Sequence, residues 1–205
     1  MQILEACGFQ CGDREELRRA DAHNLWGYYE LPSVIRFNSE AMHKALGMEW
    51  KGLKNDWELL PNPEQVHALF CYRVLKDLIP RGNRVAVKDP RFCLTLGLWA
   101  RQLLDHDVRL IYCARGEEET AKSWHKAYGV PADKALELIR ERQHALERWI
   151  DLYGIPHEVV LYENWFENPL YNALKISHLI DQPLSSHVLG VVKDRADFEK
   201  QHTNP

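Results

Sequence analysis

Short apolar runs interrupt an otherwise helical pattern of hydrophobic and polar positions along the chain. Residues 85–87 and 108–113 are rich in β-branched side chains and bounded by polar ones, and residues 157–162 form a third such segment. Buried parallel strands have this composition, because helices cover both of their faces. We therefore predict strands at residues 84–88, 108–113 and 157–162.

Apolar residues recur at helical spacing between and beyond these runs. Helices are predicted at residues 2–7, 32–46, 63–78, 93–104, 131–153 and 165–180, with one more that begins near residue 117. Residues 2–7 are expected to pack through Ile3 and Leu4, whereas residues 48–62 are predicted to be a loop and the tail from residue 185 is weakly patterned. Strands that alternate with helices favour a parallel sheet with helices on both faces, which is an α/β fold.

Size and composition narrow the class of protein. A chain of 205 residues with 45% hydrophobic residues predicts a single folded domain over residues 1–205. A formal net charge of −4 gives no reason to expect nucleic acid as a partner, and we expect neither a membrane span nor a secretory signal.

Five scattered cysteines suit a reducing compartment, so we expect a cytoplasmic protein. Cys7 and Cys11 lack a second pair that would complete a metal site, and no metal is expected.

Charged residues follow the first two predicted strands. Lys88 closes the first strand and Arg115 follows the second, with Asp89 and Arg91 close behind Lys88. In open α/β sheets, ligands bind outside the carboxyl ends of the strands. These side chains are therefore expected to converge there, and the cationic ones suit an anionic ligand.

Four segments in order resemble the bacterial branch of the sulfotransferase family, over most of residues 3–181. They are NLWGYYELPSVIRFNSEAMHKALG, KDPRFCLTL, LIYCAR with a serine eight residues after its arginine, and VVLYENWFENP. The resemblance implies a three-layer, P-loop NTPase-like sulfotransferase fold. The family's Gly/Ser/Thr-rich phosphate loop is missing, and residues 2–12 look like the helix that normally follows it. The first strand, in the middle of the family's sheet, is therefore expected to be missing too.

The resemblance also implies roles for five residues. Arg115 and Ser123 would hold the 3′-phosphate of the cofactor, and Tyr162 would border its adenine. Lys88 would neutralise charge on the bridging oxygen of the transferring sulfuryl group, as cations do in phosphoryl transfer. Glu30, the acid after the Gly-Tyr-Tyr segment, would be the catalytic base that removes the proton of the acceptor.

Other readings of these residues stay open. His23, Asp89 and His125 are rival bases, and Lys88 could instead pair with Asp89 or a helix carboxylate. Arg91 could be structural, held by Glu163 or another acid.

The implied reaction transfers a sulfuryl group from 3′-phosphoadenylyl sulfate to the hydroxyl or amine of a small-molecule or carbohydrate acceptor, without a metal. Because the phosphate loop would supply backbone N–H groups to the transferring group, we expect little activity from this chain alone. Unpaired strand edges beside the missing strand could favour self-association. The alternatives are an inactive nucleotide-binding or interaction module and, less favoured, a P-loop kinase, which would need a G-x-x-x-x-G-K-[ST] loop.

Overall fold

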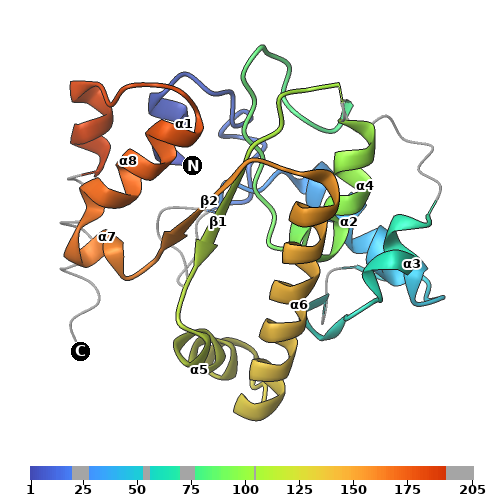
Figure 1. The fold of residues 1–205 in the computed structure, drawn as a ribbon. Coiled ribbons are helices and arrows are strands. Elements are labelled where there is room, and N and C mark those ends of the chain that lie inside the picture. Colours follow the sequence, from blue (N-terminus) through green and yellow to red (C-terminus); the bar gives the residue numbers. More distant parts are fainter. Residues whose placement is uncertain (20–27, 53–55, 70–76, 104, 193–205) are drawn as a thin grey trace.

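Two parallel strands lie between two groups of helices in the computed structural model (Figure 1). The structure describes residues 1–205 apart from 20–27, 53–55, 70–76, 104 and 193–205, and the side chain of Trp57. Strand β1 (Leu110–Ala114) pairs with β2 (His157–Leu161), and the register aligns the first residue of each strand and the last. The α/β class is therefore confirmed, as are the second and third predicted strands.

Helices make up most of the remaining described chain. They are α1 (Gln2–Ala6), α2 (Pro32–Ala45), α3 (Pro63–His67), α4 (Phe92–Gln102), α5 (Glu117–Tyr128), α6 (Ala132–Tyr153), α7 (Asn164–Glu167) and α8 (Pro169–Leu179), with a 3-10 turn η1 (Asp56–Glu58). The helix predicted at residues 63–78 ends in the structure at His67, with a turn at residues 68–69, and residues 70–76 lie outside the described part. Among the described helices, none combines the length and the apolar composition that crossing a bilayer requires.

The helix predicted at residues 165–180 is two helices. The backbone of Asn168 leaves helical geometry with φ −147° and ψ 72°, and its side chain accepts a hydrogen bond from the N–H of Tyr171. Pro169 then occupies the first helical position of α8, where the missing N–H costs nothing. An Asn-Pro pair therefore ends α7 and begins α8.

The two faces of the sheet bury different side chains of β1. Ile111 packs with Ile3, Leu4 and Ile176, from α1 and α8, on one face. Leu110 and Tyr112 pack on the other face against residues of α4 and α6, in the alternation that a strand imposes. The helical layers lie on either side of the strands in Figure 1. The predicted packing of α1 through Ile3 and Leu4 is confirmed.

The strand predicted at residues 84–88 is wrong. Val85 makes only an isolated parallel bridge to Gln10, where the N–H of Gln10 donates to Arg84 and the N–H of Ala86 donates to Gln10. The partner segment is short because Gly8 and Gly12, with φ of 83° and 97°, turn the chain on both sides of it. Apolar composition therefore identified a partly buried segment, but its partner is too short for the two to form paired strands.

The weakly patterned tail contains a helical segment over residues 186–192. The hydroxyl of Ser185 accepts the N–H of Val188, as an N-cap does. Val188 and Val192 are 1% and 4% exposed and complete the cluster beside α1 and α8. Their four-residue spacing and the preceding serine were the signal in the sequence for this helix.

Two glycines in helices give a matched test of the packing between α4 and α6. A Cβ at Gly97 would lie 2.8–2.9 Å from ring atoms of Trp149, whereas a Cβ at Gly190 meets nothing within 4 Å. We expect Gly97→Ala to destabilise the protein by about 1–3 kcal/mol through overpacking. Gly190→Ala should stabilise it by up to about 1 kcal/mol through helix propensity. Urea unfolding measures both, and a stabilising Gly97→Ala would contradict the packing.

Candidate functional site

The carboxyl ends of β1 and β2 bring two of the predicted site residues together. The N–H of Tyr162 donates to the carbonyl of Ala114 over 2.7 Å, which extends the pairing one residue beyond the strands. The exposed guanidinium of Arg115 lies over the Tyr162 ring, with Cζ 4.9 Å from the ring centre. A cation and an aromatic ring are therefore held side by side at adjacent strand ends, where ligands of α/β sheets bind.

The turn after β1 is held by the residue that follows Tyr162. The N–H of Gly116, the N-cap of α5, donates to Oε1 of Glu163 over 3.1 Å. Glu163 therefore fixes the start of α5, and not Arg91 as one reading of the sequence suggested. Ser123 lies exposed on α5, about two turns into the helix. Ser123 is therefore on the helix that follows the turn at Arg115 and Gly116.

Glu30 and Lys88 form an ion pair. The Nζ of Lys88 donates to Oε1 of Glu30 over 3.1 Å and to the carbonyl of Tyr28 over 2.8 Å. The Glu30 side chain is only 4% exposed, and its second oxygen, Oε2, accepts from Nη1 of Arg18 over 3.3 Å. The structure thus joins the two predicted catalytic residues and adds Arg18. Lys88 pairs with an acid of the loop before α2, and not with Asp89 or a helix carboxylate.

Lys88 also acts on β1. Burial raises the pKa of the Cys113 thiol, and the positive charges of the N-terminal ammonium group and Lys88 partly offset that effect. Cys113 lies in β1, two residues before Arg115.

The position of Lys88 is fixed by its neighbour Asp89, which is 5% exposed. One oxygen of Asp89 accepts from Nδ2 of Asn38 over 3.1 Å. The other accepts from the backbone N–H and Nη1 of Arg91, over 2.9 and 3.0 Å. A buried carboxylate with three donors is held in one place, and Lys88 is held with it.

The network around Asp89 joins α2, α4 and the loop between α2 and α3. The Oδ1 atom of Asn38 accepts from Thr95 and from the indole of Trp99, over 3.0 and 2.8 Å. Nε of Arg91 donates to Asp56 over 2.9 Å. Burial alone would lower the pKa of Arg91, but the two carboxylates raise it above its ordinary value. Arg91 is therefore structural, held by other acids than Glu163.

Of the rival bases that the structure describes, neither His125 nor Asp89 has a hydrogen bond or ion pair with Glu30 or Lys88. His23 lies outside the described residues. Nδ1 of His125 donates to the carbonyl of Val130 over 2.9 Å and so holds the turn between α5 and α6. Asp89 is committed to the network above. Among the described residues, no group of three His, Cys, Asp or Glu side chains could hold a metal ion.

A cavity of about 390 Å³ lies away from these residues, at the amino ends of the strands. Its lining includes Asp107, Arg109 and His157. Arg109 is already paired with Asp107 through two hydrogen bonds and donates a third to the carbonyl of Leu179. Its charge is used within the protein. We therefore place the candidate site at the carboxyl ends.

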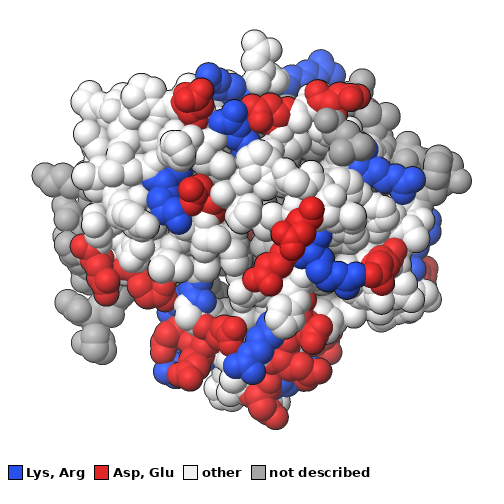
Figure 2. Space-filling view, in the orientation of Figure 1, with Lys and Arg blue, Asp and Glu red and all other residues white. Residues whose placement is uncertain are grey.

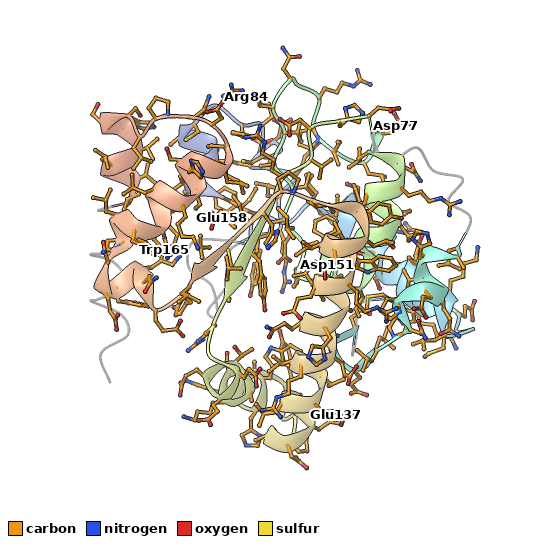
Figure 3. All side chains as sticks on the ribbon, viewed as in Figure 1. Asp77, Arg84, Glu137, Asp151, Glu158 and Trp165 are labelled. Atoms are coloured by element: carbon orange, nitrogen blue, oxygen red, sulfur yellow. The ribbon has the colours of Figure 1, made fainter. Side chains whose placement is uncertain are left out.

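Side chains from both helical layers surround the sheet in Figure 3, where Glu158 marks β2 and Asp151 marks α6.

Comparisons with protein-family models, curated proteins and solved structures found no match to this chain. The resemblance to sulfotransferases therefore rests on the four motifs alone.

Arg18 is the residue of the Glu30 ion-pair cluster that sequence reasoning missed, because it lies in a highly charged segment without a motif.

The Arg91 network can be tested against an exposed ion pair. Arg91→Met leaves two buried carboxylates without their cation, and we expect it to cost about 3–5 kcal/mol of unfolding free energy. Arg36→Met removes a pair between Arg36 and Glu40 in which Arg36 is 58% exposed, and should change stability by less than about 0.5 kcal/mol. Equal effects in guanidinium denaturation would show that the network does not hold these elements together.

Proposed function

We propose that this chain is a sulfotransferase-like domain that binds a 3′-phosphorylated adenine nucleotide at the carboxyl ends of β1 and β2. The observation that carries the proposal is the Arg115–Tyr162 pair, with 4.9 Å between the guanidinium carbon and the ring centre. A guanidinium offers forked, charged donors to a phosphate, and a neighbouring aromatic ring offers an apolar face to a base. Ser123 adds a hydroxyl donor from α5.

The transfer step would use Lys88 and Glu30. The acceptor oxygen or nitrogen bonds to sulfur, and the bond between sulfur and the 5′-phosphate oxygen breaks, with its electron pair left on that oxygen. Lys88 stabilises this developing charge. When Lys88 turns from Glu30 toward the phosphate, one oxygen of Glu30 becomes available for the acceptor proton. The products are adenosine 3′,5′-bisphosphate and the sulfated acceptor, a small molecule or a carbohydrate.

A nucleotide-binding module without transfer activity is the second candidate. It is favoured by the two ion pairs of Glu30, since a carboxylate held by both Arg18 and Lys88 must lose a cation before it can take a proton. Labelled sulfuryl donor with a panel of acceptors separates the two, and titration with adenosine 3′,5′-bisphosphate against ATP separates both from a kinase.

Replacement of Arg115 tests the nucleotide site. We expect Arg115→Ala to weaken adenosine 3′,5′-bisphosphate by about tenfold or more, the effect of one lost charge-assisted hydrogen bond, and to change adenosine 5′-phosphate far less. Arg148→Ala, which removes an exposed arginine paired with Glu64, is the control. Calorimetric titration of the wild type and both variants with each nucleotide measures all six affinities. Equal losses for the two nucleotides would reject the role of Arg115 at the 3′-phosphate.

A further inference from the structure

Glu30 holds two cations next to each other at the proposed site. Lys88 and Arg18 each bind a different oxygen of this buried carboxylate, yet their side chains are 44% and 46% exposed. Two positive charges on one negative charge leave a net positive charge at the surface. Lys88 has three N–H donors, of which Tyr28 and Glu30 take two, and Arg18 has five.

Arg18 is held in place before any ligand arrives. Its guanidinium carbon lies 3.7 Å from the ring centre of Tyr28, and its backbone N–H donates to the carbonyl of Glu30 over 2.9 Å. Tyr29, between Tyr28 and Glu30, has a φ of +53°. A non-glycine residue in this region is strained, and such strain is concentrated at binding sites. The bend at Tyr29 allows a carbonyl and a carboxylate from one short segment to hold the same lysine.

Negative charge next to Arg115 means that the second phosphate of the nucleotide needs cations elsewhere. Three acids, Glu117 to Glu119, occupy the first turn of α5 directly after Arg115 and Gly116. Acidic side chains gather over α5 and the adjoining end of α6, at the bottom of Figure 2. Arg115 can take the 3′-phosphate beside these acids, but the 5′ end of the nucleotide would meet repulsion there. The Glu30 cluster offers two cations for that end.

We propose that Arg18 and Lys88 form an oxyanion site that takes the phosphosulfate end of the nucleotide, with the Glu30 carboxylate as the counter-ion that both cations bind in the absence of a ligand. This inference rests on the proposed function. Arg18 supplies forked donors to a tetrahedral oxyanion, and Lys88 supplies a point charge beside it. The site should also bind inorganic pyrophosphate, which presents the same pair of linked tetrahedral oxyanions without the nucleoside.

Pyrophosphate titration of the full chain, followed by calorimetry, tests the site. We expect Arg18→Gln to weaken pyrophosphate about tenfold or more. Arg14→Gln is the matched control, because Arg14 is 77% exposed and pairs with Glu5 outside the cluster, and it should stay within about twofold of the wild type. Undetectable binding by the wild type at millimolar pyrophosphate, or equal binding by Arg18→Gln and the wild type, would overturn the proposal.

Glu30→Gln separates a ligand site from a purely structural ion-pair cluster. Removing the carboxylate raises the local charge by one, so pyrophosphate should bind several-fold more tightly to a folded variant, with a steeper dependence on salt. Unchanged or weaker binding by a variant with a wild-type circular dichroism spectrum would contradict the site. This variant also tests the proposal if Arg18→Gln fails to fold.

The outcomes distinguish this inference from the proposed function. Pyrophosphate binding that depends on Arg18, together with nucleotide binding that ignores Arg115, would keep the oxyanion site and reject the sulfotransferase-like function. Dependence of the 3′-phosphate on Arg115 with no effect of Arg18→Gln on pyrophosphate would keep the function and reject the oxyanion site.

Discussion

The buried carboxylate of Asp89 is the constraint on which the arrangement of the site depends. It accepts hydrogen bonds from Asn38 and Arg91, and Arg91 continues to Asp56, so one network joins α2, α4 and the loop that contains η1. A buried charge of this kind is stable only when every partner is in place. Because Lys88 is the preceding residue, the geometry that satisfies Asp89 also delivers the lysine to Glu30.

The sheet and this network each hold one group of the proposed site residues. Pairing of β1 with β2 sets Arg115 beside Tyr162, and the network sets Lys88 beside Glu30 and Arg18. In the first group the Tyr162 ring holds the cation Arg115, and in the second the buried Glu30 carboxylate holds Lys88 and Arg18. The proposed nucleotide would lie across both, with its 3′-phosphate at the first and its phosphosulfate at the second.

Periodicity was sufficient to predict elements whose partners are long and regular. The apolar stripe of α6 and the β-branched residues of β1 and β2 placed these elements within one or two residues. It failed at residues 84–88, where glycines at 8 and 12 shorten the partner segment, a property of distant residues. Strand-end position placed Arg115 beside Tyr162, whereas Lys88 follows an isolated bridge and not a strand. The partner choices of Glu30 and Arg91 depend on loops that no local pattern describes. The polar Asn38, among the buried and mostly apolar residues of α2, was a further sign of the network.

A crystal structure of the chain with adenosine 3′,5′-bisphosphate tests the central claim most directly, since it locates the nucleotide itself. We predict the 3′-phosphate within hydrogen-bonding distance of Arg115, the adenine against the Tyr162 ring and the 5′-phosphate directed toward Lys88. A nucleotide bound at the opposite edge of the sheet, in the cavity lined by Arg109 and His157, or bound with its 3′-phosphate away from Arg115, would contradict the assignment.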